Sequence, residues 1–418
     1  MELLAQWFAA LVKTIPAFLL NPFTYVGIVL VIMSWRKQQG MERKLFGTRL
    51  HRPEDVLPRQ LGSGLIAGAC LSIILLLSGV VLSPAAFLLL WVIALLLSLM
   101  GIRFLSFAYA GGLLALANLI TGHISLPEHP WLAWLWTSLH SIHLPSLYLF
   151  LALLYLTQAV LLWLGKTEHM TPVWLQGKRG KTVGGYLWQP IWIVPIVAVS
   201  PGGEPLLPYW STLGQVTSVD PLYQSWPLVA PASELTYGLI LLPAAITFSA
   251  RITSSSPQDY LRFSARWLLG YALILLVMGW VAISWSWVSV LALLLTVLGY
   301  ETLYWVLRYR EEKGRPSYMH PPEGIKIMAV IPNTPAAKMG LKPGEVVVKV
   351  NGQPIHQSEQ LYEALSKNKA FCKLEVINAE GESKFPQCSL YADDHHQLGL
   401  ILAPDHQGAS WRNTVLMD

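Results

Sequence analysis

The sequence predicts an α-helical transmembrane bundle of about seven spans, followed by a small soluble α+β domain. Only 13% of the 418 residues are charged, the mean hydropathy is +0.47, and long apolar runs recur up to residue 306. Soluble globular chains carry about 25% charged residues, and a helix needs about 20 apolar residues to cross a bilayer. These observations exclude a soluble single-domain enzyme and a disordered chain.

The expected spans make up a membrane domain over residues 1–306. The third and fourth spans meet at residues 101–103, and the sixth and seventh meet near Trp285 and Trp287, so each pair is expected to form a tight hairpin. The seven expected spans cover residues 15–35, 61–82, 84–100, 102–120, 144–164, 267–284 and 285–306.

The positions of lysine and arginine predict the orientation of these spans. Segment 36–59 carries seven of them, segment 166–181 carries four, segment 251–266 three and segment 308–310 two, and Arg103 adds one. Seven spans place all of these on one side and leave only Lys13 on the other. Because Lys and Arg accumulate in cytoplasmic loops, the C-terminal domain is expected in the cytoplasm. The basic excess is thus a topology signal and does not predict nucleic-acid binding, although segment 36–59 could also contact anionic lipid or an acidic partner.

Two segments leave alternatives open. Residues 3–19 present one apolar helical face, which suits either an interfacial helix or the start of the first span, and a crossing there would move the N-terminus to the inside. Residues 182–250 contain no Lys or Arg and are rich in proline. We expect a β-rich segment against the inner membrane face there, and an extra pair of spans is the rival.

Several polar residues are candidate functional groups. Glu301 lies within the last expected span, and an acidic residue inside a span is by default a candidate functional group. It is also close enough to the inner face to pair with a basic residue or to reach the lipid headgroups. The outer loop holds His123, Glu128, His129, His140 and His143, which suit a polar interface better than a metal site. Cys70, Cys372 and Cys388 lack metal-type spacing and predict neither a zinc site nor a disulfide framework.

The composition changes after residue 306. A charged linker is expected over 307–321, a soluble domain over 322–403 and a short tail over 404–418. Within the domain, the pattern predicts strands at 325–331, 346–350, 372–377 and 398–402, with an Asn-Gly turn at 351–352. Pro335 should begin a one-turn helix capped by Thr334, and residues 358–367 should form a helix capped by Ser358.

The motif in this domain runs Val330-Ile-Pro-Asn-Thr-Pro-Ala-Ala-Lys-Met-Gly-Leu-Lys-Pro-Gly-Glu345, followed by Val348-Lys-Val-Asn-Gly-Gln-Pro-Ile355. It resembles bacterial PDZ domains, with Glu345 standing where Asp is usual. The family's Gly-Leu-Gly-Phe-like carboxylate loop is absent before Ile325, but Gln397-Leu-Gly-Leu-Ile401 lies at the far end. The resemblance therefore implies a circularly permuted, β-barrel-like PDZ domain.

That resemblance also implies a peptide-binding site formed by strand addition. Backbone N–H groups of Leu398, Gly399 and Leu400 would hold a guest carboxylate, and the guest would pair with the strand through Ile401. The side chains of Leu361 and Leu365 would line the pocket for the last guest residue. The alternative is that 398–402 is only a closing core strand.

A second resemblance covers nearly the whole chain. An apolar N-terminal segment precedes Arg36-Lys37 and Met41-Glu-Arg-Lys-Leu-Phe-Gly-Thr-Arg49. Hairpin spans follow, then Val183-Gly-Gly-Tyr186 and Trp192-Ile-Val-Pro-Ile196, and a PDZ domain ends the chain. This layout resembles the MinJ family of polytopic PDZ proteins. The resemblance implies a multi-pass cell-membrane protein, enriched at division septa and poles, that bridges a DivIVA-like polar scaffold and the MinD ATPase.

No motif for enzyme chemistry or a cofactor was found in the sequence. Intramembrane metalloproteases need His-Glu-x-x-His on a helix, which the sequence lacks. A serine protease would need a separate catalytic domain, for which residues 316–418 leave no room. The sequence therefore predicts a non-enzymatic adaptor without cofactor. The rival function is a regulatory subunit that presents C-terminal tails to a separate membrane protease.

Overall fold

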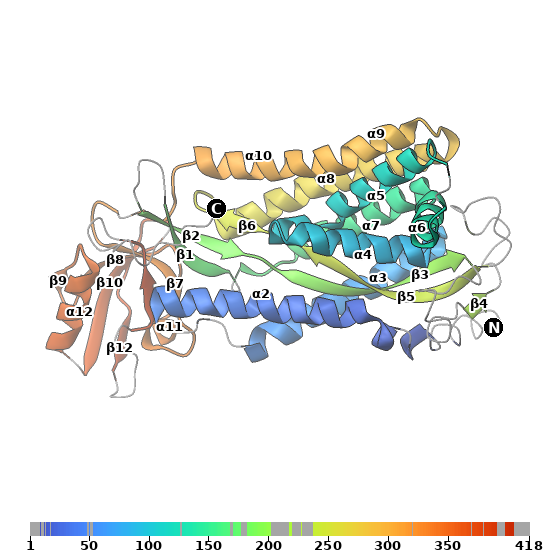
Figure 1. The fold of residues 1–418 in the computed structure, drawn as a ribbon. Helices are drawn as coiled ribbons and strands as arrows, with labels where there is room; N and C mark the ends of the chain where they lie inside the picture. The colour runs from blue at the N-terminus through green and yellow to red at the C-terminus, as the bar shows by residue number, and fades with distance from the viewer. Residues whose placement is uncertain are drawn as a thin grey trace.

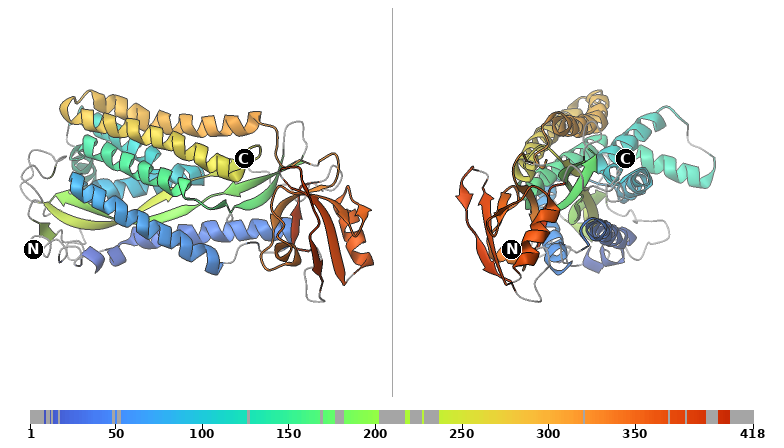
Figure 2. Two further views of the ribbon diagram at one scale, coloured as in Figure 1. Left: turned by 180° about the vertical axis from the view of Figure 1, so that it is seen from behind. Right: turned by 90° about the vertical axis from the view of Figure 1, so that its left-hand side faces the viewer.

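The helices of residues 22–313 run lengthwise and nearly side by side, and the C-terminal domain sits at one end of them (Figures 1 and 2). The computed structural model describes residues 9–404 with gaps. The gaps are 10–11, 13, 17, 48–49, 51–52, 126–127, 168–169, 177–181, 202–216, 220–226, 228–236, 320, 369, 379 and 391–397. The expectations for most of residues 3–19 and for nearly all of the tail at 404–418 lie outside the described residues.

Every expected span coincides with a helix. The helices are α2 (Pro22–Phe46), α3 (Pro53–Ser78), α4 (Pro84–Ser98), α5 (Phe107–Thr121), α6 (Pro130–His140), α7 (Leu144–Trp163), α8 (Pro257–Ser284), α9 (Val288–Leu294) and α10 (Tyr300–Lys313). In the described part of the chain, four helical stretches are long and apolar enough to cross a membrane, or five if the bent pair Thr14–Leu20 and Pro22–Phe46 is one span. Helices α4 and α5 have 15 residues each, fewer than a full crossing needs.

Both predicted hairpins are confirmed. A single 3₁₀ turn, Ile102–Leu105, joins α4 to α5, and the chain reverses between Ser284 and Val288. The last span continues without a break from α9 through one π-helical turn, Leu295–Gly299, into α10. Because α10 ends only at Lys313, the first half of the expected linker is helical and extends the last span.

The described parts of the proline-rich segment are β-structure, as expected, and they lie between the helices. Strands β3 (Ile191–Pro201) and β5 (Tyr237–Thr247) pair antiparallel, and β4 (Thr217–Val219) adds to β5. Strand β3 is buried at every residue except Pro195. A second small sheet holds β1 (Thr171–Gln176), β2 (Thr182–Trp188) and β6 (Ala250–Ile252). In Figure 1 the green strands run between the helices.

The C-terminal domain forms the predicted small α+β fold. Its sheet has the order β11-β10-β8-β7-β13, with β9 paired to β8 and β12 to β10. Its elements are β7 (Ile325–Val330), α11 (Pro335–Lys338), β8 (Val346–Val350), β9 (Gln353–Pro354), α12 (Ser358–Lys367), β10 (Phe371–Ile377), β11 (Ser383–Lys384), β12 (Gln387–Ser389) and β13 (Leu400–Leu402). Thr334 occupies the predicted N-cap position of α11, but its hydroxyl donates to the Ile331 carbonyl and makes no capping bond. The predicted cap of α12 was wrong: Gln357, not Ser358, caps that helix, in a reciprocal capping box with Gln360.

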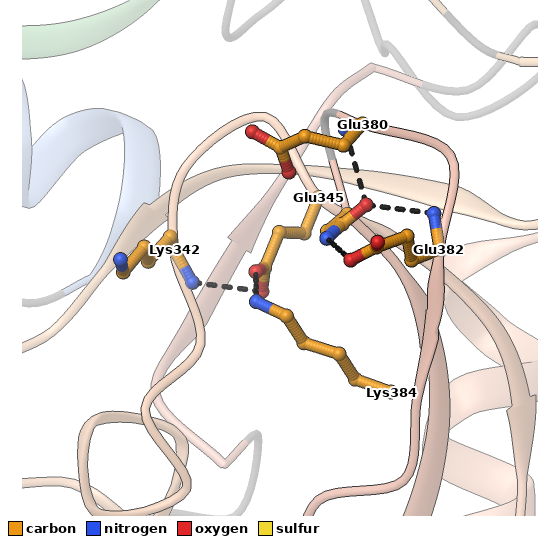
Figure 3. Close-up of polar contacts among 6 residues, drawn as sticks. Lys342, Glu345, Glu380, Glu382 and Lys384 are labelled. Atoms are coloured by element: carbon orange, nitrogen blue, oxygen red, sulfur yellow. Dashed lines mark hydrogen bonds and ion pairs between the residues drawn. The ribbon is translucent and has the colours of Figure 1, made fainter.

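The turn before β8 depends on the residue that departs from the usual PDZ pattern. The Glu345 side chain is buried, with its carboxylate accepting the Lys342 backbone N–H at 3.0 Å and the Lys384 ammonium at 2.7 Å (Figure 3). This contact raises the pKa of Lys384 above its usual value. The longer Glu side chain thus accepts a backbone hydrogen bond of its own loop and links that loop to Lys384 of β11.

Candidate peptide-binding site

Strand β13 is the edge of the PDZ sheet. Within the described residues its strand partner is β7, in an antiparallel register that pairs Leu400 with Val330. The opposite edge of β13 has no strand beside it in that part of the chain. An unpaired edge is a template for an added strand.

The backbone bonds of the loop before β13 fix the direction of its amides. The Leu398 carbonyl accepts the Ala336 N–H at 2.9 Å, and the Gly399 carbonyl accepts the Ile331 N–H at 2.8 Å. In a planar trans peptide, a carbonyl and the next residue's N–H point in opposite directions. The N–H groups of Gly399 and Leu400 therefore point away from α11 and β7, toward the free edge.

The far end of β13 offers an acceptor on the same edge. The Ala403 N–H donates to the Lys326 carbonyl at 2.8 Å, on the β7 side. By the same planarity argument, the Leu402 carbonyl points to the free edge. Donors followed by an acceptor along one edge are what an extended guest with a terminal carboxylate needs.

The loop conformation is unusual and tightly held. Leu398 has φ +55° and Gly399 has φ +80°, so two successive residues are left-handed. A non-glycine residue there is uncommon and costs free energy. Thr334 packs against Gly399 so closely that a β-carbon at Gly399 would overlap it. We infer that this loop is over-determined by its surroundings.

The expected pocket residues lie on the correct helix but differ in exposure. Leu361 has no exposed surface and Leu365 is 7% exposed, and both pack in the domain core with Leu398, Leu400 and Leu402. Tyr362 of the same helix is only partly buried against that core. Their role in holding a guest stays a prediction.

Ile401 faces away from the domain core. Leu400 and Leu402 pack within the PDZ core, whereas Ile401 and Ala403 belong to the buried cluster of the membrane domain. This alternation follows from the two-residue period of a strand. The side chain of Ile401 thus joins the two domains, and its predicted role in pairing with a guest strand stays a prediction.

The PDZ sheet is docked on β2 and on the segment before β7. The Tyr186 hydroxyl donates to the Met328 carbonyl, the Gly184 N–H donates to the Tyr318 carbonyl at 3.0 Å, and the two tyrosine rings meet edge to face at 5.3 Å. The Lys326 ammonium donates to the Ser317 carbonyl at 2.8 Å, and burial lowers its pKa. The sequence alone does not predict this interface, although one of its residues, Tyr186, lies in the motif Val183-Gly-Gly-Tyr186.

The other candidate groups have ordinary structural partners. Glu301 pairs with Arg103 at 3.3 Å and accepts the Tyr109 hydroxyl, while Arg308 pairs with Glu312. His140 stacks on Trp136, and the described residues contain no group of three side chains that could hold a metal ion.

The chain is similar to known proteins in its C-terminal domain and along nearly its whole length. The model of the PDZ domain family matches residues 326–377. The cell division topological determinant MinJ of Bacillus subtilis is 26% identical over 96% of this chain and 96% of its own. A probable cell division topological determinant MinJ of Lacticaseibacillus paracasei is 26% identical over 93% of this chain and 98% of its own. The solved PDZ domain of an SdrC-like protein from Listeria monocytogenes covers 20% of this chain and 90% of its own, at 20% identity and a TM-score of 0.18.

Two findings together identify the type of protein. The similarity to MinJ extends along nearly the whole chain, so it includes the membrane helices and the β-strands as well as the C-terminal domain. The PDZ match covers the strands and helices from β7 to β10, including α12, and ends before the loop at 398–399 and strand β13. The chain is a MinJ-like protein with a C-terminal PDZ domain.

Proposed function

We propose that this chain is a cell division topological determinant that works as a non-enzymatic, membrane-anchored PDZ adaptor. The observation that carries the proposal is the similarity along nearly the whole chain to proteins named for that role. The partners proposed are a DivIVA-like polar scaffold and a MinD-like ATPase, with the adaptor in the cell membrane at septa and poles. The four to five candidate spans support a membrane anchor, and the basic end near the PDZ domain supports a cytoplasmic site.

We further propose that the free edge of β13 captures partner C-termini. The outward N–H groups of Gly399 and Leu400 supply donors for a carboxylate, and the Leu402 carbonyl continues the ladder. The guest's last side chain would rest between β13 and α12, where Leu365 and Tyr362 retain some exposed surface.

The cellular role is tested by location and partners. A fluorescent fusion is expected at division septa and poles, and cross-linking in the same strain is expected to recover the MinD-like ATPase or the polar scaffold. An even distribution around the membrane, with a membrane protease recovered instead, would contradict the division role and favour the protease-subunit alternative.

The peptide site is tested on the full chain in detergent. Peptides from a random library with free C-termini are selected for binding, and each selected peptide is compared with its C-terminal amide. Amidation removes the carboxylate charge, and we expect it to weaken binding at least about tenfold, since hydrogen bonds to charged groups are worth about 1.5–3 kcal/mol. Hydrogen exchange should slow at residues 398–402 on binding. Equal affinity of acid and amide would show that the loop does not hold the terminus.

A further inference from the structure

The strands inside the bundle form one continuous ribbon. Trp188 pairs with Ala250, Ile191 with Thr247 and Pro201 with Tyr237, so the register between the β2–β3 strand and the β5–β6 strand never shifts. The interruption at residues 189–190 is bridged by a Phe248 N–H to Pro190 carbonyl bond of 3.3 Å. The ribbon therefore extends from Tyr186 and Ile252 at the PDZ end to Pro201 and Tyr237 at the other.

Helix α3 covers the outer edge of β3 in matched steps. Gln60, Gly64, Gly68 and Ser72 recur every four residues along α3, and they face Ile191, Ile193, Pro195 and Val197 in turn. Four helical residues rise about 6.0 Å and two strand residues about 6.6 Å, so the helix and the strand stay in step. The glycines let the backbones approach, because a β-carbon at Gly64 would lie 2.5 Å from the Ile193 carbonyl oxygen.

Three backbone polar groups on this edge have hydrogen-bond partners outside the ribbon. The Gln60 amide donates to the Ile191 carbonyl, the Val197 N–H donates to the Ser72 hydroxyl at 2.8 Å, and the Leu82 N–H donates to the Val199 carbonyl at 2.8 Å. Pro195 has no N–H to satisfy.

Backbone carbonyls on the outer edge of β5 also accept hydrogen bonds from side chains of neighbouring helices. The Trp91 indole donates to the Pro243 carbonyl at 2.7 Å, and the Gln158 amide donates to the Thr247 carbonyl at 2.9 Å. Pro243 lies directly opposite Pro195, so both prolines occupy a pair whose amide positions face outward. A strand can run at membrane depth only where its polar groups are satisfied and hidden from lipid. These bonds, and the burial of nearly every residue of β3 and β5, are in keeping with that condition.

The ribbon spans the same depth as the helices. Strand β3 keeps pace with α3 from Gln60 to the turn at Val81, which bridges to Val199. Its 11 residues extend about 36 Å, and a bilayer core is about 30 Å thick. The end of the bundle away from the PDZ domain includes residues 79–83, 285–287 and strand β4, and residues 202–236 of the sequence, like 79–83 and 285–287, contain no Lys or Arg.

We propose that the β2–β3/β5–β6 ribbon crosses the bilayer inside the helical bundle, so that Pro201, strand β4 and Tyr237 lie at the side of the membrane opposite to the PDZ domain. The ribbon adds two crossings, which cancel, so the orientation of the later helices is unchanged. The absence of Lys and Arg from residues 202–236 suits the outer side.

The proposal is tested with a specific protease site in the full chain. The site is inserted after Val219 in one variant and after Gly214 in a second, and a reference variant carries it after Asp418. Each variant is exposed to protease added outside protoplasts and, separately, to protease produced in the cytoplasm. A fourth variant with the site after Ser141, an exposed residue of the α6–α7 turn, marks the far end.

We expect the sites after Val219 and Gly214 to be cut from the same side as the Ser141 site and from the opposite side to the Asp418 site. Cutting of both loop sites from the Asp418 side would overturn the crossing. Two loop sites that resist both proteases would also overturn it, because an outer loop of this length is open to a protease.

Discussion

At the level of single residues, the loop residues Leu398 and Gly399 before β13 are tightly constrained. The amides of this loop are aimed by the bonds from Ala336 and Ile331, and Gly399 is enclosed by Thr334. The sequence predicted Leu398, Gly399 and Leu400 as the carboxylate loop by resemblance. It could not show that Gly399 has no room for a side chain, because that depends on Thr334, 65 positions earlier.

We expect Gly399→Ala to destabilise the PDZ domain, since the new methyl group would overlap Thr334 at a positive φ. Strain of this kind costs about 1–3 kcal/mol. Gly381→Ala is the matched control, because Gly381 has φ +86° but no atom within 4 Å of a new β-carbon. Pulse proteolysis of the two variants in urea measures the loss. Equal losses would mean that φ alone, and not Thr334, constrains Gly399.

The two cysteines of the PDZ domain should differ in reactivity. Cys372 and Cys388 are direct partners across β10 and β12, but Cys372 is fully buried and Cys388 is partly exposed. Burial, with a smaller effect of Cys388, raises the pKa of the Cys372 thiol to about 12. Since the thiolate is the nucleophile, iodoacetamide at pH 8 should modify Cys388 in the native protein and Cys372 only after unfolding.

The same shift gives a pH dependence of stability. An unperturbed thiol has a pKa of about 8.5. Above that pH, Cys372 loses its proton in the unfolded chain but stays protonated in the folded chain, so the free energy of unfolding falls as the pH rises. Between pH 9 and pH 11, the free energy of unfolding of the native chain should fall by up to about 1.4 kcal/mol per pH unit more than that of the Cys372→Ala variant. Urea unfolding at several pH values checks the slope, and parallel slopes would contradict it.

At the level of elements, the predictions from sequence were correct where one segment determines its own structure. The apolar runs became helices, and Pro335, the Asn351–Gly352 turn and residues 358–367 formed the predicted turn and helices of the PDZ domain. The ribbon could not be placed, because its position depends on two elements matching. Gly64 and Gly68 look like ordinary small residues of a span, and Pro195 and Pro243 suggest a broken strand until they are seen opposite each other.

We expect Gly68→Ala to loosen the contact between α3 and β3, because its methyl group would overlap the Pro195 carbonyl. Overpacking of this kind costs about 1–3 kcal/mol. Gly62→Ala on the same helix is the matched control, because nothing lies within 4 Å of its β-carbon, and it should gain up to about 1 kcal/mol of helix propensity. Thermal stability of both variants in one detergent gives the comparison. An equal loss of thermal stability in both variants would show that the close contact between α3 and the ribbon does not depend on Gly68.

At the level of the whole molecule, the sequence suggested two independent parts joined by a charged linker, and the structure instead shows them in contact. Helix α10 continues to Lys313, and Glu311 near its end accepts the N–H groups of Thr253, Ser254 and Ser255. The ribbon then reaches the PDZ sheet through Tyr186. Charge and periodicity along the chain cannot predict this contact, since it joins β2 to β7 across about 140 positions.

This contact predicts that the membrane domain stabilises the peptide-binding edge of β13. Tyr186 donates to the Met328 carbonyl on β7, and β7 carries β13, so loss of that bond should reach the peptide edge. Tyr186→Phe keeps the ring against Tyr318 and removes only the hydroxyl. A single hydrogen bond contributes about 0.5–1.5 kcal/mol, so amides of 325–330 and 400–402 should exchange about 2- to 10-fold faster. Tyr309→Phe, at a 57% exposed tyrosine of α10, should change nothing. Unchanged exchange in Tyr186→Phe would mean that the PDZ sheet is held by its own fold alone, and that guest binding at β13 is not linked to the ribbon.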